Sequence, residues 1–352
     1  MRKNLFFALL LSLACVSCTP NKSIFNGRLV EIKKFDYTSK IIGKKLFLTD
    51  PPQGIIGIHK MDSLIMFKYN SRRTDYLLAL YDVKNDQFLG NLLRIGRGPD
   101  EFLSIDYWGE YSIDYDDDRH IYFSAINEKA ILKCNVSDFV RSGTYTTEKL
   151  HTFPAFSMNT HVLNDTCFLS YFHDIDRQQM LYRKFYSTNG NYTDYALYNI
   201  KIPTPNDFGF LWSAEYLKPS KDKLALAMDS FCLINILDFN NPNNNLSIIP
   251  DRSLYEDFET LSNKAPQERL ITYVNLKCTD QYIFALYSGH IPGKRDQVSG
   301  VELHVVDWKG RGIARLFIDE ILMALYIDES CKTMYAFDHL EQLYTYDLSE
   351  II

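Results

Sequence analysis

Basic and histidine side chains recur in the segments that separate strand-like runs, where they could bind an anionic ligand or transfer protons. The candidate ligand-binding residues are Arg72, Arg73, Arg97, His173, His290 and Arg295. Arg72 and Arg73 could contact an anion, and His173 stands beside acidic residues with which it could carry out acid–base chemistry. His290 and Arg295 could recognise the carboxylate of a sugar acid. A solvated loop is the simpler interpretation of each residue, so these assignments are hypotheses.

Residues 95–102 read Ile-Gly-Arg-Gly-Pro-Asp-Glu-Phe and combine a cation with two acids. Arg97 could bind an anion here while one of the acids donates a proton to it. The preferred interpretation is structural: the glycines allow positive φ, the proline fixes a turn, and Phe102 packs in the interior. The segment is not a phosphate-binding loop, because the Lys-Ser/Thr ending and the following helix are absent.

No motif in the sequence points to a metal, a cofactor or a nucleophile. The densest acidic group, within residues 114–118, lacks the glycine and the terminal Glu that a calcium loop requires, so a solvated turn is favoured. Beyond residue 18 there is no Cys-x-x-Cys pair or Cys/His cluster for zinc, and the chain contains neither Gly-x-Ser-x-Gly nor His-Glu-x-x-His. We therefore assign no metal site, cofactor or catalytic residue. An enzyme that draws single residues from separate segments stays open.

The first residues of the chain indicate export. Residues 1–4 form a short basic segment, residues 5–16 are apolar except for one serine, and Ser17 and Cys18 precede a polar stretch. A basic start, a short apolar centre and a small residue before the cleavage point are typical of a secretory signal. The apolar run is shorter than the roughly 20 residues that a membrane span needs. We therefore predict a signal peptide over residues 1–17.

This segment resembles a bacterial lipoprotein signal, in which a small residue precedes a cysteine. The resemblance implies that the cysteine sulfur is acylated and that the protein is attached to a membrane by a stable lipid anchor. Cys18 is the preferred anchor, because the apolar centre then keeps its full length and a polar tether follows over residues 18–27. Cys15, which follows an alanine, is the alternative. An ordinary secreted protein with an incidental cysteine is a further alternative.

The mature chain is predicted to be acidic. The full sequence carries 38 Lys and Arg against 44 Asp and Glu, a net charge of −6, and removal of the signal would also remove Arg2 and Lys3. Such a charge argues against nucleic acid as a partner, because nucleic-acid binding needs a basic face. Beyond residue 18 the cysteines are widely spaced and odd in number, and we expect buried single thiols.

A pattern of four strands repeats six times along the mature chain. One recurring strand ends in Asp, Asn or Ser, at positions 82, 135, 187, 238, 307 and 347, and turn-forming residues follow. An Asx or Ser side chain can bond the backbone two residues further on, which suits a junction between strand and turn. The last set lacks its outer strand, whereas residues 28–35 form a spare one, and a short helix is expected within residues 254–268.

These repeats predict an all-β fold, a six-bladed β-propeller over residues 28–352 that is closed by an N-terminal strand in the last blade. Residues 28–35 are the predicted closing strand, because closure protects the edges that an open stack of blades would expose. Seven blades or another array of β-sheets is the alternative.

Residues 95–102 also carry a family resemblance. They resemble the Gly-x-Gly-Pro-x-Glu-Phe segment that lies between blades in six-bladed propellers of Bacteroidetes. With the signal and the repeat, the chain is similar to the TolB-like six-bladed β-propeller lipoproteins of those bacteria. The resemblance implies a fold and an envelope location but no activity. The partners of TolB itself are not carried over, because this chain has no room for the additional N-terminal domain of TolB.

The function expected from these features is that of a cell-envelope lipoprotein whose propeller binds a partner protein or a glycan. The alternative is a propeller enzyme, a lyase or a hydrolase, that acts on carbohydrate. Recognition is expected on the face shared by the loops between second and third strands and the loops between blades. Residues 19–22 lack the acidic cluster that, by resemblance, signals surface display. An outer-membrane location facing the periplasm is therefore expected, and surface display stays open.

Overall fold

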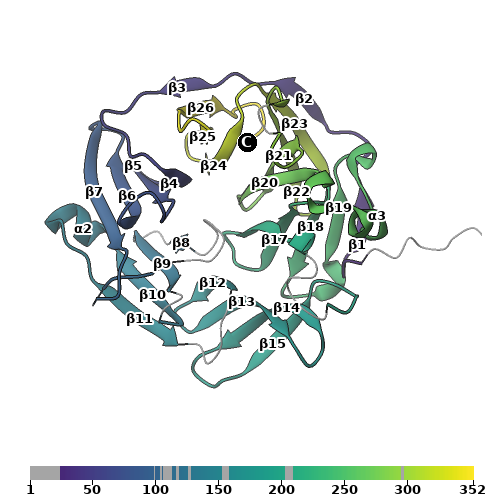
Figure 1. The fold of residues 1–352 in the computed structure, drawn as a ribbon, viewed down its shortest axis with the longest axis horizontal. Helices are drawn as coiled ribbons and strands as arrows, with labels where there is room; N and C mark the ends of the chain where they lie inside the picture. The colour runs from purple at the N-terminus through teal and green to yellow at the C-terminus, as the bar shows by residue number, and fades with distance from the viewer. Residues whose placement is uncertain are drawn as a thin grey trace, which may run out of the picture.

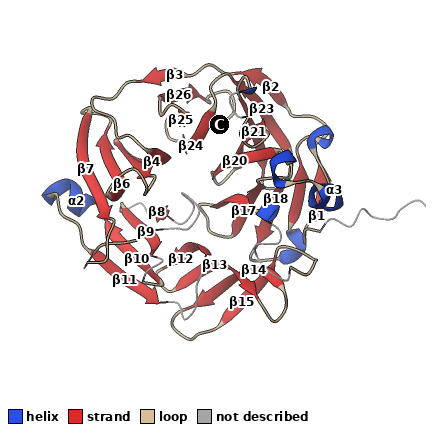
Figure 2. Ribbon diagram, in the orientation of Figure 1, coloured by secondary structure: helices blue, strands red, loops and turns tan. Residues whose placement is uncertain are grey.

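The computed structural model describes residues 24–98, 100–103, 105, 113–115, 119–125, 128–152, 158–202, 209–294 and 297–352. Within these residues, six sheets of four or five strands are arranged in a ring around a central axis (Figure 1). Strands make up most of the ring, and the two α-helices of the described part of the chain lie at its periphery (Figure 2). This arrangement confirms the all-β, six-bladed propeller that the sequence predicts.

Each blade is an antiparallel meander whose first strand lies nearest the axis. Blades 1 to 3 consist of β4 (Ile55–Met61), β5 (Leu64–Tyr69), β6 (Tyr76–Asp82) and β7 (Gln87–Arg94); β8 (Ile113–Tyr115), β9 (His120–Ala125), β10 (Ala130–Asn135) and β11 (Thr147–Thr152); and β12 (Met158–Asn164), β13 (Cys167–Asp174), β14 (Gln179–Tyr186) and β15 (Tyr192–Ala196). Blades 4 to 6 contain β16 (Ser213–Leu217), β17 (Lys223–Met228), β18 (Ile234–Asp238) and β19 (Leu246–Ile249); β20 (Ile271–Cys278), β21 (Tyr282–His290), β22 (Val301–Asp307) and β23 (Gly312–Ile318); and β24 (Leu322–Asp328), β25 (Thr333–Asp338) and β26 (Leu343–Asp347).

The middle strands are buried on both faces, because each blade packs against its neighbours. β5 and β18 are buried at every residue. Two-sided burial explains why these strands read as continuous apolar runs instead of alternating with polar residues. The predicted Asx turns follow them: Asp82 accepts a hydrogen bond from the backbone N–H of Lys84 at 3.0 Å, and Asp307 accepts one from that of Lys309 at 2.9 Å.

Phe102 belongs to the core between blades 1 and 2. Its ring is fully buried and meets the ring of Phe123 edge to face, with the centroids 5.3 Å apart. Burial of such a side chain contributes about 1.5–3 kcal/mol of stability. Before it, the Glu101 carboxylate accepts a hydrogen bond from the backbone N–H of Gly98 at 2.8 Å. These contacts support a structural role for the glycine-rich segment.

An N-terminal strand closes the last blade, as predicted, but residues 28–35 were the wrong choice for it. The closing strand is β3 (Lys44–Leu46), which pairs antiparallel with β26. β1 (Arg28–Glu31) instead adds a fifth strand to blade 4 by pairing parallel with β19, and β2 (Tyr37–Lys40) does the same beside β23 of blade 5. The outer edges of blades 4 and 5 can each accept an extra parallel strand, and the apolar pattern of residues 28–35 does not distinguish one open edge from another.

Short helices occupy the connections. The helix expected within residues 254–268 is present as α3 (Phe258–Asn263), with the 3₁₀ turns η4 (Arg252–Leu254) and η5 (Pro266–Glu268) on either side; η3 (Pro242–Asn244) joins β18 to β19. The sequence analysis did not predict α2 (Val136–Ser142), which begins at the N-cap Asn135 and ends at Gly143. Among the described residues, no helix has the length and apolar character needed to span a bilayer.

Candidate functional site

A cavity of about 600 Å³ opens at one end of the central channel. Its lining residues belong to the hairpins that join the first and second strands of blades 1, 2, 4 and 6. The lining residues are His59, Lys60, Met61, Asp62, Arg119, Tyr216, Leu217, Lys218, Pro219, Lys221, Tyr326, Asp328 and Ser330. In a meander, successive turns lie at alternate ends of the blade. The cavity is therefore at the end opposite to the loops between second and third strands.

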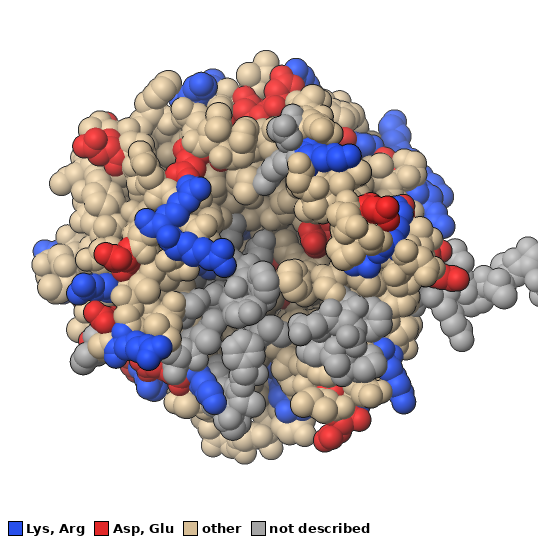
Figure 3. Space-filling model, viewed as in Figure 1, with Lys and Arg blue, Asp and Glu red and all other residues tan. Residues whose placement is uncertain are grey.

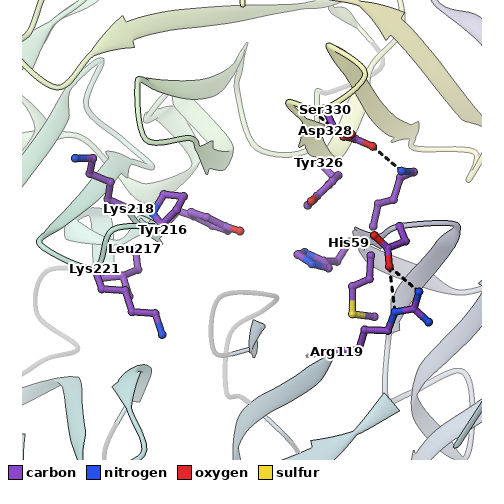
Figure 4. A pocket seen from close by; sticks show the side chains of 13 residues that line it. His59, Arg119, Tyr216, Leu217, Lys218, Lys221, Tyr326, Asp328 and Ser330 are labelled. Atoms are coloured by element: carbon purple, nitrogen blue, oxygen red, sulfur yellow. Dashed lines mark hydrogen bonds and ion pairs between the residues drawn. The ribbon is translucent and has the colours of Figure 1, made fainter. Parts of the chain in front are cut away.

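Aromatic side chains from different blades face this cavity. Tyr216 of β16 and Tyr326 of β24 point into it from opposite sides, and His59 of β4 lies beside Tyr326 (Figure 4). The rings of His59 and Tyr326 meet edge to face, with their centroids 4.6 Å apart. Lysine, arginine and aspartate side chains also line the cavity, which thus offers aromatic faces and hydroxyl groups within charged surroundings. A space-filling view along the ring axis shows basic and acidic side chains interspersed around the hollow at the middle of the face in view (Figure 3).

Two ion pairs form part of the wall. The Lys60 ammonium and the Asp328 carboxylate are 2.5 Å apart, and their side chains are 14% and 9% exposed. Burial alone would raise the pKa of Asp328, but hydrogen bonds from Lys60 and Ser330 outweigh it and lower that pKa from 3.8 to about 2. In the second pair, Arg119 donates to the Asp62 carboxylate from Nε at 3.2 Å and from Nη2 at 2.6 Å. Both carboxylates are therefore engaged by cations of the wall.

His59 is a neutral polar group of the cavity wall. Its side chain is buried, and burial together with the charge of Lys277 lowers the pKa of the imidazole well below 6.5. At pH 7 the ring is therefore uncharged. Burial, with a further contribution from Asp328, raises the pKa of the neighbouring Tyr326 hydroxyl, which stays protonated.

The opposite wall is the turn between β16 and β17. Lys218 approaches Asp222 at 3.4 Å, and its ammonium lies 5.6 Å from the centre of the Trp308 ring. The ammonium of the buried Lys277, from β20, lies 4.8 Å from the centre of the Tyr216 ring. The hydroxyl end of Tyr216 faces the cavity (Figure 4). The ring that carries this hydroxyl therefore has the Lys277 ammonium packed against it.

Three charged residues of the cavity have left-handed backbone conformations: Asp62 with φ 52°, Arg119 with φ 60° and Lys221 with φ 58°. This conformation costs roughly 1–2 kcal/mol for a residue with a Cβ. Other hairpin turns of the ring share it. At this end of the channel, the turns hold charged side chains at the opening.

A buried polar cluster lies beneath the Tyr216 wall, between blades 3 and 4. Glu215 is fully buried, and one carboxylate oxygen lies 3.2 Å from Nε2 of His161. The hydroxyl of Tyr182 donates to the other oxygen. Burial and the Glu215 charge raise the pKa of Tyr182 well above 10. The cluster links β12 and β16, the innermost strands of blades 3 and 4, and so fixes the base of the Tyr216 wall.

The arginines predicted from the sequence lie away from this cavity. Arg72 and Arg73 are exposed in the loop between β5 and β6, and Arg73 pairs with Glu341 at 3.0 Å. Arg97 is exposed in the glycine-rich segment after β7. None of these three side chains lines the cavity. Arg295 lies outside the described residues, as do Cys15 and Cys18.

The two predicted histidines make internal hydrogen bonds. Nε2 of His173 is 2.6 Å from the carbonyl oxygen of Ile202. Nδ1 of His290 is 2.7 Å from Oγ of Ser288, and both of these side chains are buried, 7% and 4% exposed. A hydroxyl beside an imidazole is also the arrangement of a nucleophile and its base, but this pair is shielded from solvent. A ligand-binding role for the six predicted residues stays a prediction.

The cavity residues were not among those predicted from the sequence. Their signal lies at the ends of the innermost strands, where an aromatic residue or a histidine occupies one of the last three positions, as in His59, Tyr216 and Tyr326, and in the turns that follow, which contain basic residues. The loops at the other end of the channel are longer, and for that reason the binding site was predicted there.

The family described as TolB-like 6-blade propeller-like matches residues 32–330. The chain therefore belongs to this family, and the predicted resemblance to TolB-like six-bladed propellers is confirmed. No match was found among curated protein sequences.

One solved structure supports the same fold, and a second is less similar. A member of the DUF4221 family from Bacteroides vulgatus superimposes with a TM-score of 0.55 at 12% sequence identity, over 87% of this chain and 95% of that chain. Hydrazine synthase from Kuenenia stuttgartiensis gives a TM-score of 0.47 at 10% identity, over 87% and 79% of the two chains. At such identities the likeness concerns the fold alone, and only the first TM-score is high enough to support it.

Proposed function

We propose that this protein is a cell-envelope lipoprotein, acylated at Cys18 and facing the periplasm from the outer membrane, whose propeller binds a glycan in the channel cavity. The N-terminal signal and its cysteine support the anchor and the location. The propeller fold supports a binding or scaffold module in general. The cavity supports the choice of ligand.

The cavity at the channel end is the observation that carries the glycan proposal. Its volume of about 600 Å³ lies within the range of about 300–1,000 Å³ that is usual for small-ligand sites. Tyr216 and Tyr326 can stack on sugar rings and hydrogen-bond to hydroxyl groups, and the ion-paired wall supplies further donors and acceptors. A partner protein would more simply use a broad, shallow surface, because protein interfaces bury about 800 Å² on each side.

A carbohydrate enzyme is the second candidate function, and the cavity favours a lyase over a hydrolase. Hydrolysis of a glycosidic bond uses two carboxyl groups, one of which is protonated near neutral pH. Here the pKa of Asp328 is lowered to about 2, and Asp62 is held by Arg119. A lyase needs an unprotonated base to remove a proton from the sugar, and the His59 imidazole in the cavity wall is unprotonated at pH 7.

A glycan array probed with the full chain tests the binding proposal. We expect at least one glycan to bind, Tyr216→Ala to weaken binding about tenfold, and Tyr216→Phe to retain most of it because the ring is kept. Tyr186→Ala, which removes a tyrosine at the end of β14 that does not line the cavity, is the control. Capture of an envelope protein whose binding Tyr216→Ala leaves unchanged, with no glycan bound, would replace the glycan proposal.

The same bound glycan separates binding from lyase chemistry. Incubation with the protein should leave it intact if the cavity only binds. Cleavage with formation of an unsaturated sugar, abolished in His59→Ala but retained in Tyr186→Ala, would establish the lyase instead.

Metabolic labelling with an alkyne fatty acid tests the anchor. Label should be incorporated into the wild-type protein and into Cys15→Ala, but not into Cys18→Ala. Label in Cys18→Ala that is lost in Cys15→Ala would move the anchor to Cys15, and no label in the wild type would exclude a lipoprotein. Protease treatment of intact cells tests the face: a periplasmic domain should survive it, and its removal would show surface display.

A further inference from the structure

We propose that the cavity selects an acidic sugar, a uronic or sialic acid residue, whose carboxylate pairs with Lys221 while its ring lies against Tyr216. This inference rests on the proposed glycan-binding function and names the class of glycan.

The charge of the cavity differs in sign from that of the chain. The whole chain has a net charge of −6. The lining nevertheless contains four cations, Lys60, Arg119, Lys218 and Lys221, and two acids, Asp62 and Asp328. An excess of positive charge in a concave site on an acidic protein attracts anions to that site and not to the surrounding surface.

Lys221 holds this excess charge. Lys60 is paired with Asp328 and Arg119 with Asp62, and Lys218 has Asp222 beside it. Within the described part of the chain, Lys221 is the lining cation that has no acidic partner. A ligand carboxylate can therefore approach it without displacing a carboxylate of the protein.

The turn that carries Lys221 is fixed in place before a ligand arrives. The backbone N–H of Lys221 donates to the carbonyl oxygen of Lys218 at 2.7 Å, and Pro219 restricts the turn between them. Ser220 attaches the turn to blade 5, because its backbone N–H donates to the Asp280 carboxylate at 3.0 Å. A preformed turn reduces the entropy lost on binding.

Tyr216 supplies the neighbouring sugar contact. It precedes the turn by two residues, and its side chain extends into the cavity on the same side as Lys221 (Figure 4). The ammonium of Lys277, 4.8 Å from the centre of the Tyr216 ring, adds positive potential at this wall. Across the cavity, His59 is neutral at pH 7, so it adds a polar group without adding charge. The wall is thus arranged for a ring with an attached anion.

The experiment measures binding of matched sugars to the full chain by isothermal titration calorimetry. The probes are digalacturonate with its neutral counterpart galactobiose, which differ in the carboxylates, and sialyllactose with lactose. We expect an acidic probe to bind about tenfold more tightly than its neutral counterpart at low salt, and the advantage to shrink in 0.5 M NaCl as ions screen the pair.

Variants of the turn assign the effect to Lys221. Lys221→Gln should bring the acidic probe down to the affinity of the neutral one, whereas Lys221→Arg should keep most of the advantage because the charge remains. Lys84→Gln, in the exposed turn after β6, is the matched control and should change neither affinity. Unchanged thermal unfolding of each variant would show that the fold is retained.

The possible failures are distinguishable. If acidic and neutral probes bind equally and Lys221→Gln has no effect, while Tyr216→Ala abolishes both, the acidic-sugar inference is wrong and the glycan site stands. If no probe and no glycan on the array binds, the proposed function fails and the inference fails with it.

Discussion

The ion pair between Lys60 and Asp328 joins the first blade to the last, and we expect its removal to lower the stability of the fold. Lys60 is on β4 and Asp328 ends β24, so the bond crosses the seam at which the ring closes. Both side chains are largely buried, and Asp328 also accepts hydrogen bonds from Oγ of Ser330 at 2.5 Å and from its backbone N–H at 3.1 Å. Asp328→Asn keeps the shape of the side chain and removes its charge.

The expected loss of stability in Asp328→Asn follows from the lowered pKa of Asp328. A lowering from 3.8 to about 2 corresponds to about 2 kcal/mol of stability at neutral pH, at about 1.4 kcal/mol per unit. The ammonium of Lys60, whose side chain is 14% exposed, is left without its partner in the variant. Since breaking a buried pair costs about 3–5 kcal/mol and this pair retains some contact with water, we expect a loss of about 2–3 kcal/mol at pH 7.

The sign of the pH dependence is fixed by the direction of the shift. A carboxyl whose pKa is lower in the folded state stabilises the fold above its unfolded value of 3.8, and this contribution is lost as the pH falls towards about 2. The difference between wild type and Asp328→Asn should therefore be full at pH 7 and decrease between about pH 4 and pH 2.

Urea denaturation at several pH values, followed by tryptophan fluorescence, measures this difference. Asp36→Asn is the matched control, because its carboxylate is 62% exposed and lies 3.9 Å from Arg311; such a surface pair contributes about 0–1 kcal/mol. A loss in Asp328→Asn that equals the control at pH 7, or one that stays constant down to pH 2, would refute the assignment.

Three further predictions concern packing and thiol exposure. Gly43→Ala places a Cβ 2.7 Å from the ring of Tyr346 beside the closing strand, so we expect a loss of about 1–3 kcal/mol in urea denaturation; no loss would show that the seam adjusts freely. Gly96→Ala places a Cβ 1.9 Å from the Glu101 carboxylate, which must then move and give up the hydrogen bond from the Gly98 N–H, so we expect a smaller loss of about 0.5–1.5 kcal/mol, measured as a lower Tm than that of wild type. Among the described cysteines Cys331 is the exposed one, so a thiol reagent should label it rapidly in the native protein and Cys331→Ser should abolish that labelling; fast labelling of a second described cysteine would contradict the burial.

The sequence predicted the strands well where an apolar run ends at an Asx residue. β6, β10, β18, β22 and β26 end at the Asx positions that the pattern predicts, 82, 135, 238, 307 and 347. In these strands, two-sided burial produces the apolar run, and the Asx residue marks the point at which the strand ends. Both signals are local in the sequence. The position of a strand along the chain was thus largely a local property.

Pairing between distant segments was the part that local signals could not supply. β3 is a three-residue strand with two lysines, Lys44 and Lys45, and has a weak strand signal, yet it closes the ring. The more apolar segment of residues 28–35 looked like the better closing strand. α2 was missed for the related reason that it has seven residues and buries Val136 and Phe139 alone.

The cavity could not be predicted as a site, although its residues were visible. Lys60, Arg119, Lys221 and Asp328 come from four blades, and in each local segment they look like ordinary charged turn residues. What brings them together is the closure of the ring. Charged residues in turns are usually solvated, so only the three-dimensional arrangement distinguishes these four.

The N-terminal strands also determine the order in which the molecule can form. β1, β2 and β3 pair with β19, β23 and β26, each more than 200 positions later in the chain. Contacts over such separations form slowly, because the loop that joins them must first be closed. Blades 1 to 3 need no residue from this segment for their sheets, whereas blades 4, 5 and 6 lack an outer strand until it arrives. The first part of the chain to be synthesised is therefore the last that can fold, and until then three sheet edges remain open to pairing with other chains.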